Sequence, residues 1–124
     1  MPLAGCMGGA LGLQTDGSYL LENDEQQGSC DALAKSLWGR IQLIKTLPAA
    51  AKAERAAPPP TASSALGRWF GGTHKGLKAF EDYDRERAHA RALQRTLRSK
   101  GCPIIDVDRE IAQTAAEIER LRQE

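Results

Sequence analysis

The stretch that decides the fold is GLKAFEDYDRERAHARALQRTLRSKGCP, residues 76–103. Its apolar side chains recur close to a heptad, and that spacing is typical of an amphipathic or coiled-coil-like helix. The members of this stripe are Phe80, Tyr83, Ala90, Leu93 and Leu97. Acidic residues fill the N-terminal half and basic residues the C-terminal half, in the order that the helix dipole favours. The pattern predicts a helix from about His74 or Gly76 to Lys100. Gly101 then supplies a left-handed stop.

Two further helices are predicted, one on each side of this stretch. The earlier one begins near Ser29, because serine can cap a helix N-terminus. Its stripe, with spacings of four, four and three, consists of Leu33, Leu37, Ile41 and Ile44. Pro48 ends or kinks this helix, and the alanine-rich residues 49–57 can continue as a second helical segment. The later helix begins at Asp106 or Asp108 and carries a stripe of Val107, Ile111, Ala115 and Ile118.

The composition limits the size of the core. The chain has 124 residues, and Leu, Ile, Val and Phe together make up less than one-fifth of them. Large β-barrels and doubly wound α/β enzymes need more apolar volume than this. The sequence therefore predicts an all-α fold, a small elongated three- to four-helix bundle or helical hairpin.

The chain divides into a predicted tether and a predicted helical domain. Residues 1–28 are rich in glycine and large apolar side chains are few among them, a composition typical of a flexible N-terminal tether. Within them, residues 18–21 (SYLL) can form a short strand or dock on the folded body. Residues 29–124 form the helical domain, with a proline-rich linker at 58–60.

The first residues contain a short motif, Leu3-Ala4-Gly5-Cys6. It resembles the lipobox of small bacterial lipoproteins, and the resemblance covers four residues. It implies cleavage before Cys6, lipid (palmitate) on the thiol, and a basic and apolar signal leader upstream of Met1. The alternative is that Cys6 is an ordinary cysteine in a glycine-rich tail.

The chain has three cysteines, an odd number for a disulfide scaffold. If Cys6 is lipidated, Cys30 and Cys102 remain as a pair, and an exported protein would oxidise them. In an antiparallel pair of helices, the start of the first and the end of the second meet at the same end. A disulfide there is the prediction, and two reduced, buried cysteines in a cytosolic protein are the alternative.

Four arginines share one face of the central helix. They are Arg87, Arg91, Arg95 and Arg98, at spacings of four, four and three. Such a face can bind phosphates of nucleic acid or of anionic lipid. The favoured alternative is neutralisation within the fold, since residues 101–124 carry a net charge of −3 and residues 61–100 a net charge of +5. Acid–base pairs at helical spacing, such as Glu81 with Arg85 and Asp84 with Arg87, are also expected.

The densest aromatic spot is Trp69-Phe70. We expect it either to cover the end of the core or to contact a partner, as exposed aromatic residues often do. The net charge of +1 argues against a dedicated nucleic-acid binder.

No catalytic or metal motif is found in the sequence. His74 and His89 lie 15 residues apart, far from zinc-ligand spacing, and we expect both on the exposed surface. Neither a nucleophile elbow nor a phosphate-binding glycine loop is found, and no cofactor is expected.

The sequence therefore predicts a membrane-tethered periplasmic lipoprotein with a structural or adaptor role. It would bind the membrane through lipid on Cys6 and a protein partner through Trp69, Phe70 or the arginine face. The alternative function is a cytosolic helical protein that binds nucleic acid or a partner through the arginine face.

Overall fold

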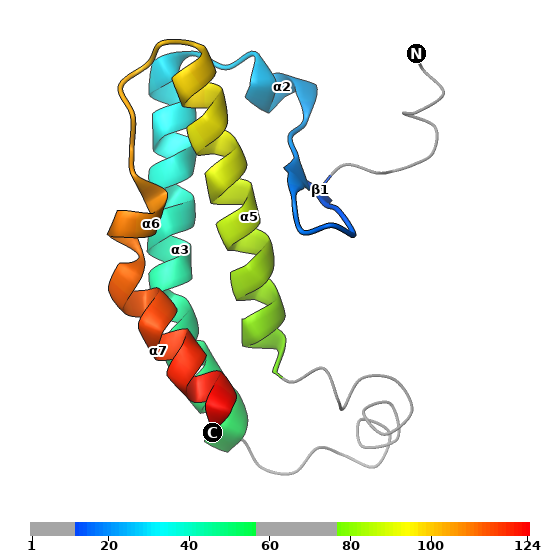
Figure 1. Cartoon of the computed structure of the whole chain (residues 1–124), viewed down its shortest axis with the longest axis vertical. Coiled ribbons are helices and arrows are strands. Elements are labelled where there is room, and N and C mark those ends of the chain that lie inside the picture. The colour runs from blue at the N-terminus through cyan, green and yellow to red at the C-terminus, as the bar shows by residue number, and fades with distance from the viewer. Residues whose placement is uncertain (1–11, 57–76) are drawn as a thin grey trace.

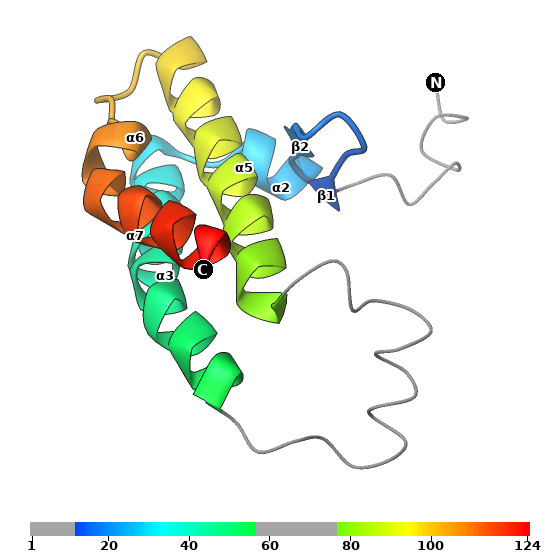
Figure 2. The ribbon, with the colours of Figure 1, turned by 60° about the horizontal axis from the view of Figure 1, so that its bottom comes forward.

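The computed structural model describes residues 12–56 and 77–124 of the chain. Two long helices run antiparallel and side by side, and the C-terminal segment packs back along them (Figures 1 and 2). In chain order the elements are β1 (Gly12–Leu13), β2 (Tyr19–Leu20), α2 (Asn23–Gln26), α3 (Cys30–Ala56), α5 (Lys78–Ser99), α6 (Val107–Glu110) and α7 (Ala112–Gln123). The predicted all-α fold is confirmed, with a small two-stranded sheet added at the N-terminal side.

Helix α3 begins where the sequence predicts. The backbone N–H of Ala32 donates a hydrogen bond to the Ser29 hydroxyl at 3.1 Å, which is the expected N-cap. The helix then continues through Pro48 to Ala56 as one element. Proline removes one backbone donor, but here its ring is buried beside Leu47. The alanine-rich extension is therefore part of α3.

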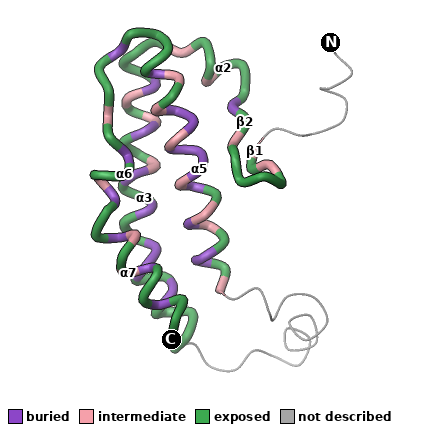
Figure 3. Tube along the Cα trace, in the orientation of Figure 1, coloured by how far each residue is buried: buried purple, intermediate pink, exposed green. Residues whose placement is uncertain are grey.

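The core lies along the seam between α3, α5 and the C-terminal segment, where buried positions recur at helical spacing (Figure 3). The large side chains that are under 2% exposed are Leu37, Ile41, Ile44, Leu93, Leu97, Val107, Ile111 and Ile118. Each such side chain contributes roughly 1.5–3 kcal/mol relative to an exposed one. The predicted stripes are thus the buried faces of the helices.

A disulfide joins the two long helices at one end. The Cα atoms of Cys30 and Cys102 are 5.6 Å apart, across a sequence separation of 72 residues. Cys30 is the first residue of α3, and Cys102 follows the end of α5. The antiparallel arrangement brings them together, as the sequence predicts.

The turn after α5 is the predicted glycine stop. Gly101 has a φ of +75°, in the left-handed region that favours glycine. The backbone N–H groups of Gly101 and Cys102 donate to the carbonyls of Arg98 and Leu97, at 3.1 and 3.0 Å. The last carbonyls of the helix are satisfied in this way.

The C-terminal segment differs from the prediction of one helix. Asp106 caps α6, accepting a hydrogen bond from the Arg109 backbone N–H at 3.2 Å. The helix is then interrupted at Ile111, whose φ of −106° and ψ of 11° leave the helical region. The Ile111 side chain is 1% exposed, so the interruption coincides with a position anchored in the core. Helix α7 resumes at Ala112.

Residues 12–28, which we call the cover segment, are folded and do not form part of a tether. Strands β1 and β2 pair antiparallel, and the turn between them contains Gly17 with a φ of +91°. Leu21 is 5% exposed and belongs to the core cluster. Helix α2 follows, with a reciprocal capping box between Glu22 and Glu25. Both alternatives for residues 18–21 are thus found together, since Tyr19 and Leu20 form a strand and Leu21 packs in the core, and the folded domain begins before residue 29.

Candidate functional site

Three predicted interaction residues, Cys6, Trp69 and Phe70, lie outside the described residues, as does His74. Within residues 12–56 and 77–124, no helix is both long and apolar enough to cross a membrane. In the same ranges, no group of three or more His, Cys, Asp or Glu residues could hold a metal ion.

His89 is buried, contrary to the prediction that it lies on the surface. It is 5% exposed, and its Nε2 atom lies 2.6 Å from the carboxylate of Glu25 in α2. Its ring also stacks on Tyr19 of β2, with centroids 4.0 Å apart and planes 6° from parallel. The prediction was wrong because the cover segment folds over this face of α5. His89 thus contacts both β2 and α2 of that segment.

The same packing affects Tyr19. Burial raises the pKa of the Tyr19 phenol, and the nearby carboxylate of Glu25 acts in the same direction. The position in which Tyr19 stacks on His89 therefore favours the neutral phenol.

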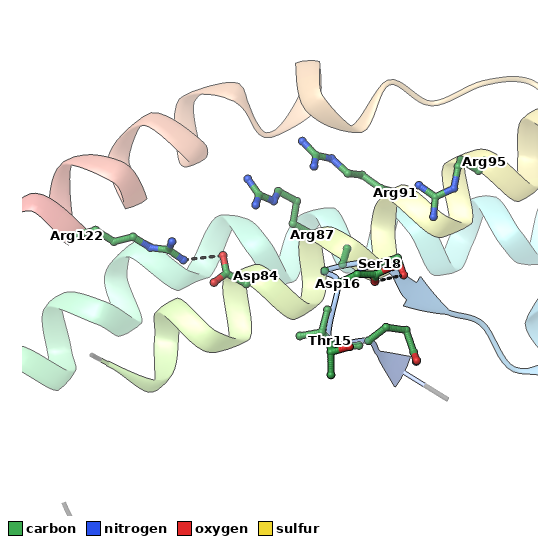
Figure 4. Close-up of a pocket in the computed structure, with 12 residues that line it drawn as sticks. Thr15, Asp16, Ser18, Asp84, Arg87, Arg91, Arg95 and Arg122 are labelled. Carbon is green, nitrogen blue, oxygen red and sulfur yellow. Dashed lines mark hydrogen bonds and ion pairs between the residues drawn. The ribbon is translucent and has the colours of Figure 1, made fainter. Parts of the chain in front are cut away.

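Three of the four predicted arginines line one pocket. Arg87, Arg91 and Arg95 project from α5, and Arg122 joins them from α7 (Figure 4). The pocket has a volume of about 680 Å³, and its opposite wall is the β1–β2 turn, residues 13–18. A volume of this order is typical of small-molecule sites.

Arg98, the fourth predicted arginine, does not line this pocket. It is exposed in the last turn of α5. The predicted face is therefore divided into a walled part and an open part.

Two of the pocket arginines are paired with carboxylates. Both Nε and a terminal nitrogen of Arg91 contact one oxygen of Asp108, at 3.1 and 2.8 Å. Arg122 contacts Asp84 at 2.7 Å and also donates to the carbonyl of Phe80 at 3.2 Å. The expected neutralisation by the C-terminal segment thus holds for Arg91.

The other two pocket arginines have no carboxylate partner among the described residues. The predicted pair of Arg87 with Asp84 is wrong, because Asp84 turns to Arg122. The Arg87 guanidinium lies over the Tyr83 ring instead, 5.2 Å from its centroid. Arg95 is exposed and makes no ion pair within residues 12–56 and 77–124. Among the described residues, two guanidinium groups of the pocket therefore have no ion-pair partner.

The β1–β2 turn brings a second carboxylate, Asp16, to the pocket. The hydroxyl and backbone N–H of Ser18 both donate to its Oδ1, at 2.7 and 2.9 Å. These hydrogen bonds lower the pKa of the Asp16 carboxyl, the one from the hydroxyl most strongly. Asp16 is thus ionised and engaged within its own turn. With four arginines and two aspartates, the lining has a positive balance.

Sequence reasoning missed Arg122, Asp16 and the wall that Asp16 belongs to. The Asp16-Gly17 dipeptide is a turn signal that could have predicted the hairpin. Nothing local marks Arg122, because its partners Phe80 and Asp84 lie 42 and 38 residues away in the chain. No protein-family model, curated protein or solved structure is found to match the chain.

Proposed function

We propose that the chain is the folded domain of a periplasmic lipoprotein, tethered to a membrane through lipid on Cys6, with a non-catalytic adaptor role. The observation that carries this proposal is the pairing of Cys30 with Cys102. Disulfides form and persist in oxidising compartments and are rare in the cytosol. An exported chain leaves Cys6 as the one cysteine outside the pair, consistent with its lipobox-like context.

A binding role is supported by what the described surface offers. The arginine pocket presents cations and a polar turn, and α3 exposes Trp38 and Leu43, which are 39% and 42% exposed. His89, the one histidine in residues 12–56 and 77–124, is occupied by Glu25 and Tyr19. The groups gathered in the pocket suit recognition of a ligand better than proton transfer.

The proposal is tested on the natural product, expressed with its own upstream codons. Mass spectrometry of the mature protein is expected to find Cys6 at the N-terminus, carrying lipid, and Cys30 and Cys102 resistant to alkylation until reduced. The Cys6→Ser variant is the matched control, and it is expected to leave the membrane fraction. A mature protein that keeps residues 1–5, has an unmodified Cys6 and remains in the cytosolic fraction would contradict the proposal.

A second candidate is a cytosolic protein that binds nucleic acid or a partner through the arginine face. The observation in its favour is that Arg95 and Arg98 are exposed on one side of α5, without ion pairs among the described residues. This candidate requires that Cys30 and Cys102 are reduced in the cell. The alkylation experiment therefore distinguishes the two.

A further inference from the structure

We propose that the pocket between α5 and the β1–β2 turn binds a compact phosphorylated ligand, whose phosphomonoester or pyrophosphate group is held by Arg87 and Arg95. This inference goes beyond an adaptor role and does not depend on a lipid at Cys6. It rests on the arrangement of the charges, the state of each arginine, and the wall that closes the site.

The arginines are spaced to act together. Arg87, Arg91 and Arg95 follow one another at intervals of four residues, so each is about 6 Å further along the helix axis. The side chains line one continuous hollow (Figure 4). Guanidinium groups match phosphate oxygens with two parallel hydrogen bonds, which carboxylate-free Arg87 and Arg95 are able to supply.

The two paired arginines have different roles. The pair of Arg91 with Asp108 is exposed, with 43% and 67% of the two side chains accessible, and pairs of this kind contribute little. Arg91 can therefore exchange Asp108 for a ligand phosphate. Arg122 is held by Asp84 and by the rings of Phe80 and Tyr83, with its guanidinium carbon 5.2 and 5.9 Å from the ring centroids. It is a fixed wall of the pocket.

The turn opposite α5 determines what kind of anion fits. The stack of Tyr19 on His89 and the bond from His89 to Glu25 hold the cover segment on α5. The turn presents the side chains of Thr15, Asp16 and Ser18 to the pocket. A ligand can contact both walls if its phosphate faces the arginines and the rest of the molecule, bearing hydroxyl groups, faces this turn.

A compact ligand fits this site better than a nucleic acid does. The open part of the arginine face, at Arg98, lies outside the pocket. A duplex requires a continuous exposed basic surface, and the net charge of +1 provides little long-range attraction. The walled pocket therefore favours a single phosphate-bearing group.

The test uses the full chain with its disulfide intact and titrates it with inorganic pyrophosphate by calorimetry at low salt. The variant Arg87→Gln with Arg95→Gln is expected to weaken pyrophosphate binding at least about tenfold, because two charge-assisted donors are lost. The matched control, Arg98→Gln with Lys100→Gln, removes the same charge at the C-terminal end of α5, where neither side chain lines this pocket, and is expected to bind like the wild type. Circular dichroism and thermal unfolding check that both variants fold.

A second arm distinguishes the source of the phosphate. Vesicles of neutral lipid containing phosphatidic acid present the phosphomonoester as a headgroup, and binding is measured by co-sedimentation. Binding to these vesicles that is lost in Arg87→Gln with Arg95→Gln supports the proposal and identifies a lipid headgroup. Pyrophosphate binding with the same dependence, but no vesicle binding, supports it and identifies a soluble ligand.

Three results would overturn the proposal. The first is no heat of binding with millimolar pyrophosphate together with no vesicle binding. The second is equal weakening by the pocket variant and by the Arg98→Gln, Lys100→Gln control, which indicates diffuse attraction by charge. The third is tight binding of duplex nucleic acid that depends on Arg98 and Lys100 and is not displaced by pyrophosphate.

Discussion

The helical hairpin of α3 and α5 and the cover segment are held in place by different means. The hairpin is closed by fully buried side chains such as Leu37, Ile41 and Leu93, and by a covalent bond at one end. The cover segment contributes one buried core side chain, Leu21, and is also held by Tyr19 stacked on His89 and by the contact of His89 with Glu25. A region held by few contacts opens at a lower free energy than one held by a core.

This difference matters because the arginine pocket uses both regions. Its floor, with Arg87, Arg91 and Arg95, belongs to the rigid helix α5. Its wall, residues 13–18, belongs to the weakly held cover segment. The molecule therefore combines fixed cations with a wall that can be displaced separately. Four predictions separate the two regions.

The largest effect is expected from removing the covalent bond of the hairpin. The variant Cys30→Ala with Cys102→Ala no longer closes a loop of about 70 residues, and the free energy of unfolding is expected to fall by about 4 kcal/mol in the chain-entropy model. Urea unfolding followed by circular dichroism measures this. Reduced wild-type protein is the control and is expected to match the variant. Equal stability of oxidised and reduced protein would contradict the prediction.

A smaller loss of stability is expected from breaking an ion pair between α3 and α5. Arg40 of α3 contacts Glu86 of α5 at 2.9 Å, and the Glu86 side chain is 8% exposed. The change Arg40→Ala leaves that carboxylate buried with Arg85, at 3.6 Å, as its remaining partner, and is expected to cost about 2–3 kcal/mol. Urea unfolding measures this cost.

The double variant Arg40→Ala with Glu86→Leu tests the cause of that loss. It removes the buried charge as well as its partner, so it is expected to recover part of the stability. A double variant that is less stable than Arg40→Ala alone would show that the unpaired carboxylate of Glu86 is not the cause of the lost stability.

The sequence predicts the hairpin and its disulfide well. The signals for the helices are local, and the disulfide follows from the pairing of the helices. The apolar period identifies both long helices, Ser29 and Gly101 mark their ends, and antiparallel pairing then places Cys30 near Cys102. Each inference needs little more than the spacing of residues within one helix.

The candidate site is predicted less well, because its contacts join distant parts of the chain. His89 meets Glu25 across 64 residues, and Asp84 prefers Arg122, 38 residues away, to the nearby Arg87. The helical spacing identifies three of the pocket arginines. The spacing does not indicate which arginines have a carboxylate partner, or that the β1–β2 turn faces them. Both features depend on how the C-terminal segment and the cover segment pack.

The third prediction concerns the cover segment alone. The change His89→Ala removes both the stack on Tyr19 and the contact with Glu25, and local opening of residues 12–28 is expected to become easier by about 1–2 kcal/mol. Hydrogen exchange measured by NMR is expected to accelerate roughly five- to thirtyfold in this segment, with core amides such as that of Leu37 changing less.

The variant His89→Phe divides this effect into its parts. It keeps an aromatic ring for Tyr19 and loses the contact with Glu25, so its exchange rates are expected to lie between those of the wild type and His89→Ala. Uniform acceleration across the core and the cover segment would contradict the view that the two regions open separately.

The smallest effect is expected at Asp82, whose ion pairs are made with exposed side chains of α5 itself. Lys78 and Arg85 contact Asp82 at 2.8 Å each, and the hydrogen bond from Lys78 is the main reason that the pKa of the Asp82 carboxyl lies below its ordinary value. A lowered folded-state pKa stabilises the protein above the ordinary pKa, and this stability is lost as the pH falls through the folded-state value.

The change Asp82→Asn is expected to lower the free energy of unfolding by about 0.5 kcal/mol at neutral pH, because both partners are exposed. It is also expected to make stability less sensitive to acid below pH 4. Urea unfolding at a series of pH values measures both. The control is Glu81→Gln at the neighbouring position. The predicted pair of Glu81 with Arg85 is wrong, because Arg85 contacts Asp82 and Glu86 instead, and Glu81 has no ion pair within residues 12–56 and 77–124. If Asp82→Asn instead accelerated exchange in residues 12–28, surface charge on α5 would be coupled to the cover segment, and the two regions could not be treated as independent.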